Sequence, residues 1–88
     1  MIEAEVTVVN RAGIHTRPAA SLVKLAARFK SEIFLIRDGF AINAKSIIGV
    51  MTLAAEQGSK LTLRVEGEDE ESAVNDISAL FASGFGEE

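Results

Sequence analysis

The sequence predicts an α+β fold in which four antiparallel strands form one sheet and three helices lie on one face of it. Segments with alternating apolar residues are interspersed with segments whose apolar residues have helical spacing, in the order βαββαβα. Asp38-Gly39, between two of the strand-like segments, is typical of a two-residue hairpin turn and favours antiparallel pairing. Each predicted helix has one apolar face, so the helices are expected to share one side of the sheet.

The first half of the chain contains three strands and one helix by these patterns. The strand from Ile2 to Val8 is apolar at every second position, and the segment from Pro18 to Phe29 has the spacing of an amphipathic helix. Two strands, over 32–37 and 40–43, flank the hairpin turn. Both faces of the strand over 32–37 are apolar, which fits ordinary β propensity on a partly covered surface better than a dimer interface.

The second half is expected to contain two helices around one strand. Ser46 can cap a short helix over 47–53, and alternating apolar residues predict a strand over 60–65. Asp69 is the expected N-cap of the last helix. Gly84 followed by Phe85 suits the end of that helix, with a hydrophobic contact behind the glycine.

The run Asn10–Ala19 places the single histidine of the chain where a helix is expected to begin. Gly13 allows a backbone bend that a Cβ would resist. Pro18 suits a first helical turn, and it pushes the residue before it out of the helical region. His15 is therefore expected at the junction of loop and helix, beside unpaired N–H groups and the positive end of the helix dipole. Such a place attracts anions, and Arg17 adds a permanent positive charge.

This environment predicts that His15 carries a phosphoryl group. Positive charge nearby favours the neutral imidazole, whose lone pair can attack phosphorus. After transfer, the same N–H groups and Arg17 attract the phosphoryl oxygens. The attractions amount to about a tenfold bias, which is weak enough for the group to be passed on. The alternative is that His15 is only a surface or capping residue, which is the usual role of a single histidine in a small domain.

The run Asn10–Ala20 resembles the active-site signature of the HPr family, the histidine-containing phosphocarriers of the bacterial phosphoenolpyruvate-dependent phosphotransferase system. A second run, Asn43–Met51, is similar to the regulatory serine segment of that family, and the similarity extends over the whole chain. The resemblance implies an open-faced β-sandwich. It also implies phosphorylation of His15 on its Nδ1 atom, with Thr16 and Arg17 completing the catalytic site and with no metal or organic cofactor.

Ser46 has two interpretations. Its position before a predicted helix favours a capping role that contributes about 1 kcal/mol. The resemblance implies that it is also phosphorylated by an ATP-dependent HPr kinase/phosphorylase. A phosphate there would sit on a helix N-terminus, so it should repel acidic partners without unfolding the protein.

A small apolar surface edged by positive charge is expected beside His15. Three neighbouring apolar residues of the short helix cannot all face inward, since Val50 and Leu53 can supply the buried side. Such a patch suits brief docking, and the resemblance implies enzyme I and enzyme IIA components as the partners. The residues expected to form it are Ala20, Lys24, Ile47, Ile48 and Met51.

Composition narrows the class of protein further. The 88 residues are expected to form a single domain over 1–88, and the absence of cysteine removes disulfides and thiolate metal sites. A formal net charge of −4 and scattered basic residues argue against a nucleic-acid binder. No signal peptide or membrane-spanning run is visible, so we expect a monomeric protein of the cytoplasm with no membrane insertion.

Two features depart from the common pattern of the family. Ala27 stands where many members have a basic residue, and the tail from Ala82 to Glu88 runs on, where some relatives end near the active site. The tail and the acidic last helix resemble the nitrogen-related branch of the family, which is regulatory. A non-transferring module that binds a transcriptional regulator or an enzyme is the alternative from another class. A hydrolase with His15 as base is disfavoured, because no serine or cysteine is paired with it by a recognisable motif.

Overall fold

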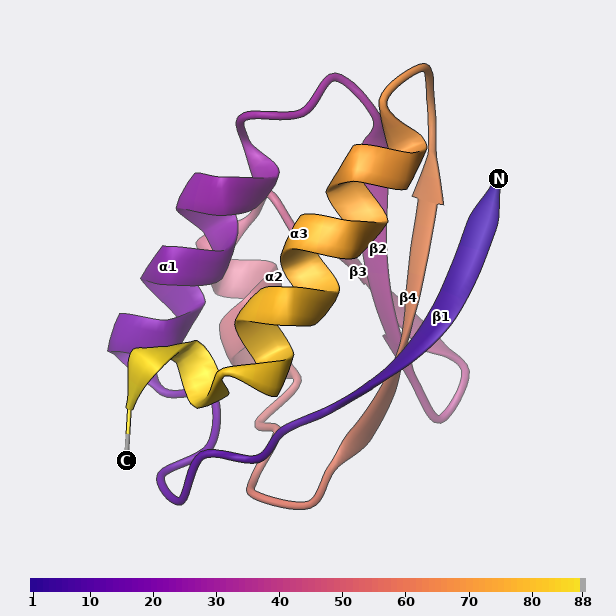
Figure 1. Ribbon diagram of the computed structural model, residues 1–88. Helices are drawn as coiled ribbons and strands as arrows, with labels where there is room; N and C mark the ends of the chain where they lie inside the picture. The colour runs from indigo at the N-terminus through magenta and orange to yellow at the C-terminus, as the bar shows by residue number, and fades with distance from the viewer. Residues whose placement is uncertain (88) are drawn as a thin grey trace.

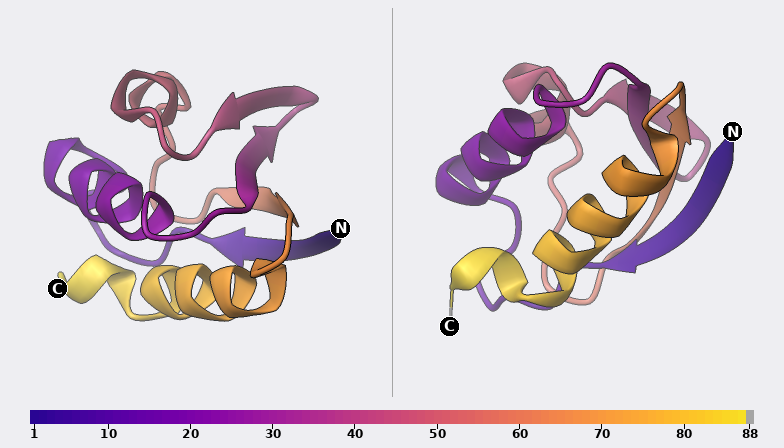
Figure 2. Two further views of the ribbon diagram at one scale, coloured as in Figure 1. Left: turned by 90° about the horizontal axis from the view of Figure 1, so that it is seen from above. Right: turned by 45° about the horizontal axis from the view of Figure 1, so that its top comes forward.

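The computed structural model describes residues 1–87 and contains one four-stranded sheet with three α-helices (Figure 1). The strand order is β1-β4-β2-β3, and every neighbouring pair is antiparallel. The helices lie on one face of the sheet and leave the other face open, as both views in Figure 2 show. The predicted fold class and element order are therefore confirmed. In chain order the elements are β1 (Ile2–Thr7), α1 (Thr16–Ala26), β2 (Glu32–Arg37), β3 (Phe40–Asn43), α2 (Ile47–Thr52), β4 (Lys60–Glu66), α3 (Glu70–Ala82) and the 3-10 turn η1 (Gly84–Gly86).

The core lies between the inner face of the sheet and the helices. Leu63 of β4 pairs with Leu35 of β2, and both side chains are buried. Leu61 and Val65 of β4 and Ile33 of β2 are buried on the same face. On the open face, Arg64 donates to Glu3 across the β1–β4 pair at 2.8 Å. The alternation of buried and exposed positions thus follows the sequence pattern directly.

The β2–β3 hairpin has the predicted bounds and the predicted turn. Asp38 and Gly39 both have positive φ, at 52° and 78°, as a tight turn with the strand twist requires. The hairpin places β3 beside α2, whose buried residue Val50 joins the core.

Helix α1 starts two residues before the predicted Pro18 and ends three before the predicted Phe29. Its start differs because Pro18 lies within the first turn, where a missing N–H breaks no helical hydrogen bond. Its end differs because the amides of Arg28 and Phe29 turn to the carbonyls three residues back, Leu25 and Ala26, and so leave the α-helical pattern. Leu25 is half-buried against the core.

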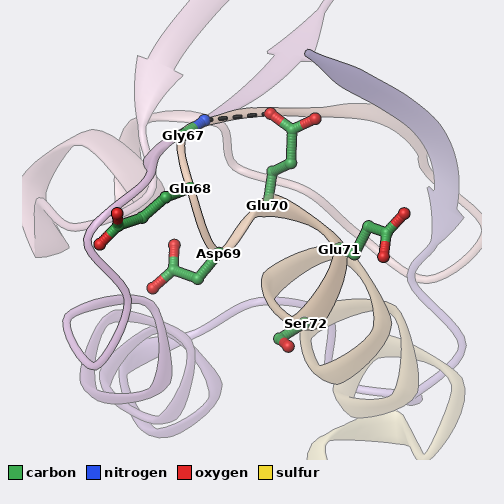
Figure 3. A pocket seen from close by; sticks show the side chains of 6 residues that line it. All are labelled: Gly67, Glu68, Asp69, Glu70, Glu71 and Ser72. Carbon is green, nitrogen blue, oxygen red and sulfur yellow. Dashed lines mark hydrogen bonds between the residues drawn. The ribbon is translucent and has the colours of Figure 1, made fainter.

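Asp69 is the N-cap residue of α3, as the sequence predicts, but its side chain makes no capping hydrogen bond. Its carboxylate instead accepts hydrogen bonds from the backbone N–H groups of Lys30 and Ser31, at 2.8 and 3.0 Å, and from the Ser31 hydroxyl. Glu70, the first residue of α3, accepts from the N–H of Gly67, which lies before the helix, at 3.1 Å (Figure 3). Asp69 therefore ties the start of α3 to the loop before β2.

None of the helices within residues 1–87 combines the length and the apolar character needed to cross a membrane.

Candidate functional site

The loop before α1 is held by backbone hydrogen bonds to the segment between α2 and β4. Ile14 donates to the carbonyl of Ala55 at 2.8 Å, and Gly58 donates to the carbonyl of Val8 at 2.7 Å. Gly13 has φ +73°, and a Cβ built on it would lie 2.6 Å from the Ala55 oxygen. Gly13 is therefore required both for the left-handed bend and for the close approach of the two backbone segments. This contact fixes the position of the backbone just before His15.

His15 is the N-cap residue of α1, with extended backbone, as the sequence predicts. Its side chain makes no capping hydrogen bond and is 43% exposed, so the imidazole is accessible to a partner. The backbone N–H of His15 donates to the Gly13 carbonyl at 3.1 Å. Pro18 has no N–H, and the helix itself leaves the amides of Thr16 and Arg17 unpaired. These two amides, with the exposed Arg17 side chain, give the site its positive character.

A carboxylate that the sequence analysis did not place here touches the imidazole. The Nε2 atom of His15 lies 3.2 and 3.1 Å from the two carboxylate oxygens of Glu87. The buried Asn10 side chain donates to one of the same oxygens at 3.0 Å and to the Gly13 carbonyl at 2.8 Å. His15, Glu87 and Asn10 therefore form one connected cluster at the start of α1.

The C-terminal tail, which the sequence shows running on beyond the last helix, brings the Glu87 side chain back to this cluster. Gly84, Phe85 and Gly86 all have positive φ, which turns the chain sharply after α3. Phe85 is buried, and its ring meets that of Phe81 edge to face with centroids 4.9 Å apart. This anchor directs Glu87 toward the start of α1, and Figure 1 shows the yellow turn after α3 near the lower end of α1.

The site is more balanced in charge than the sequence suggested. Glu87 is mostly buried, with 16% of its side chain exposed. Its burial raises the pKa, but hydrogen bonds from His15 and Asn10 and the charges of His15 and Arg17 lower it, and the net pKa lies below the ordinary value. Glu87 is therefore ionised at neutral pH, and the imidazole faces a negative charge on one side and the positive end of the helix on the other.

Ser46 lies at the start of α2, and the expected apolar patch spans α2 and the neighbouring helix α1. The Ser46 hydroxyl oxygen accepts from the Gly49 N–H at 3.1 Å, so Ser46 is the N-cap of α2, and it is exposed. Ile48 is 74% exposed, whereas Val50 and Leu53 are buried, so the expected division of this segment into an outer and an inner side is confirmed. The five residues predicted to form the patch are all exposed: Ala20, Lys24, Ile47, Ile48 and Met51.

A concave region lies at the N-terminal end of α3 and does not suit an anion. It has a volume of about 370 Å³ and is lined by residues 67–72. Figure 3 shows four carboxylates around it, those of Glu68, Asp69, Glu70 and Glu71. These negative charges would repel a phosphoryl group, so the start of α1 is the better site for one.

The sequence singles out His15, Thr16 and Arg17 as candidate site residues, but it does not assign a role to Asn10 or Glu87, whose side chains the structure brings to the imidazole. Asn10 begins the run that resembles a family's active-site signature, and the only local signal for Glu87 is a phenylalanine between two glycines near the end of the chain. Neither signal indicates a contact between segments more than seventy residues apart.

Comparison with known proteins places these features in a family. Residues 2–83 match the family model described as the phosphorylation site of the PTS HPr component. The phosphocarrier protein HPr of Treponema pallidum is 53% identical over the full length of both chains. The crystal structure of HPr-C-His from Thermoanaerobacter tengcongensis aligns with a TM-score of 0.96 and 43% identity, and covers 100% of this chain and 99% of that one. A crystal structure of an HPr dimer from the same organism aligns with a TM-score of 0.80 and 42% identity, over 99% and 100% of the two chains.

Proposed function

The chain belongs to the HPr family of phosphocarriers of the phosphotransferase system, and from that premise we propose that it accepts a phosphoryl group on His15. The donor is phospho-enzyme I, and the acceptors are enzyme IIA components. The protein acts as a stoichiometric carrier, since the group it receives is the group it passes on.

One observation carries this proposal: the single imidazole of the chain is partly exposed at the N-terminal end of α1. The amides of Thr16 and Arg17 point out of the helix there, and their dipoles favour negative charge by roughly 0.3–1 kcal/mol. A phosphoryl group on His15 would thus be stabilised, but only enough to be held between two transfers. The apolar surface on α1 and α2 gives partners a place to dock close to the imidazole.

Incubation with phosphoenolpyruvate and enzyme I tests the proposal. The wild-type protein should gain one acid-labile phosphoryl group, detected as a single addition by intact-protein mass spectrometry and lost on mild acid treatment. A His15→Ala protein should gain none. An acid-labile phosphoryl group on the His15→Ala protein would refute the assignment of His15.

Ser46 is proposed as a regulatory phosphorylation site. Its hydroxyl is exposed while its oxygen caps α2, so a kinase can reach it and a phosphate would meet the amides of the first helical turn. An HPr kinase with ATP should add an acid-stable phosphate to the wild type and not to Ser46→Ala. The phosphorylated protein should remain folded and should dock less well to acidic partners.

A regulatory binding module is the second candidate, because Ile48 is 74% exposed on a surface that a carrier and a binding module would both use. The two candidates differ in what phosphorylation does. A module would bind its partner equally well with and without a phosphoryl group on His15 and would transfer none to enzyme IIA. A carrier should transfer the group and change its affinity with phosphorylation.

A further inference from the structure

We propose that Glu87 is a positioning residue for phosphoryl transfer, an inference that rests on the proposed function of His15. Both oxygens of its carboxylate lie within 3.2 Å of His15 Nε2. An ionised carboxylate is only an acceptor of hydrogen bonds, so Nε2 must carry the proton in this contact. The other ring nitrogen, Nδ1, then holds the lone pair and is the nucleophile.

The cluster around Glu87 is built to hold the carboxylate in place. Asn10 is 2% exposed, and its amide nitrogen divides its two hydrogens between Glu87 and the Gly13 carbonyl. Within residues 1–87 the Asn10 side-chain oxygen is buried without a hydrogen-bond partner, which is costly. The amide therefore serves the site as a donor only. On the other side, the buried ring of Phe85 fixes the turn from which Glu87 extends.

The transfer step balances with the Nε2 proton left in place. The lone pair of Nδ1 forms a bond to phosphorus while the bond from phosphorus to the donor atom breaks, and the electron pair of that bond leaves with the donor. The imidazole then carries a phosphoryl group on Nδ1, a proton on Nε2 and a positive ring charge. The carboxylate of Glu87 lies against that charge and stabilises it, as the carboxylate of a catalytic triad stabilises an imidazolium. Onward transfer reverses these changes, and no proton has to move.

The position of the proton can be measured without enzyme I or phosphoenolpyruvate. Two-bond ¹H–¹⁵N spectra of protein labelled with ¹⁵N at histidine report the two ring nitrogens separately. The spectra are recorded at a pH of about 8.5, because this is well above the reference imidazole pKa of about 6.5 and the ring is then neutral. The wild type should be mainly protonated on Nε2. Loss of the hydrogen bond in Glu87→Ala should reduce the ratio of the two tautomers about five-fold. Glu87→Gln should also reduce it, because an amide can donate to Nε2 as well as accept from it.

Glu71→Gln is the matched control, since it removes the same charge from an exposed glutamate at the other end of α3. It should leave the tautomer ratio unchanged. Backbone amide spectra of Glu87→Gln should match those of the wild type except in the tail and around Asn10 and His15, which separates a loss of positioning from a loss of fold. A tautomer ratio that is the same in the wild type, Glu87→Ala and Glu87→Gln would overturn the proposal.

The transfer equilibrium gives an independent test. With a fixed ratio of phosphoenolpyruvate to pyruvate and catalytic enzyme I, the phosphorylated fraction of Glu87→Gln should correspond to an equilibrium constant about three-fold lower than that of the wild type. Glu71→Gln should match the wild type, and an equal constant for Glu87→Gln would contradict the stabilisation of the ring charge. If the wild type accepts no phosphoryl group, the proposed function fails, whereas the tautomer measurement still decides the role of Glu87 toward the imidazole.

Discussion

Replacement of Gly13 by alanine should destabilise the protein more than the same replacement at a glycine with equal backbone strain. Gly13 has φ +73°, and a Cβ there would lie 2.6 Å from the Ala55 oxygen and 3.0 Å from the Glu56 Cα. Both neighbours are backbone atoms, which cannot rotate away. The Ala55 oxygen also accepts the Ile14 N–H at 2.8 Å, so relief of the clash would stretch or break that hydrogen bond.

Gly39 provides the matched control. It has φ +78°, close to that of Gly13, and a Cβ on it would meet nothing within 4 Å. Gly39→Ala should therefore cost only the left-handed backbone term, roughly 1–2 kcal/mol. Gly13→Ala should cost that amount plus about 1–3 kcal/mol for overpacking. Since each kcal/mol lowers the melting temperature of a domain of this size by about 4–8 °C, the two variants should differ clearly.

Urea unfolding followed by circular dichroism measures both variants on the same scale. The phosphorylation rate by enzyme I, measured well below the unfolding midpoint, should also fall for Gly13→Ala and not for Gly39→Ala. This second result follows because the Gly13–Ala55 contact sets the position of His15. Equal losses of stability in the two variants, with equal phosphorylation rates, would refute the reasoning.

Three further predictions concern other parts of the molecule. Ser46→Ala removes the hydroxyl that accepts from Gly49 and should lower the free energy of unfolding by about 1 kcal/mol, whereas Ser46→Asp should stay closer to the wild type in urea titrations. The Ser31 hydroxyl, with the Lys30 and Ser31 backbone N–H groups, lowers the pKa of Asp69 below its ordinary value of 3.8. The hydrogen bonds to the ionised Asp69 therefore stabilise the folded state above about pH 3.8, and this stabilisation is lost as the pH falls through the lower pKa of the folded state. The difference in unfolding free energy between the wild type and Asp69→Asn should stay constant near neutral pH and narrow below pH 3.8. Ile48→Asp changes a side chain that is 74% exposed, so the free energy of unfolding should change by less than about 0.5 kcal/mol. The same substitution should weaken the binding of enzyme I, measured by calorimetry.

Local patterns in the sequence predicted the elements whose geometry is decided locally. The hairpin is an example, because residues that tolerate positive φ at Asp38 and Gly39 determine both the turn and the register of the two strands beside it. His15 could be placed at the start of α1 for a similar reason, since Gly13 and Pro18 limit where the helix can begin.

The residues that were missed or misread depend on contacts between distant segments. Asp69 has the local signature of an N-cap, but its carboxylate accepts hydrogen bonds from the amides of Lys30 and Ser31. The packing of α3 on the sheet brings these amides close to it. Glu87 belongs to a tail with no periodic pattern, and its contact with His15 exists only because Phe85 is buried against α3. No pattern along the chain reports such a contact.

Transfer of a labelled phosphoryl group through the protein tests the central claim most directly. With phosphoenolpyruvate labelled in its phosphoryl group, enzyme I and an enzyme IIA component, label should reach enzyme IIA only when the wild-type protein is added. It should stop at enzyme I when His15→Ala is added in its place. Label on enzyme IIA in the presence of His15→Ala, or none with a wild-type protein that has itself been labelled, would contradict the account.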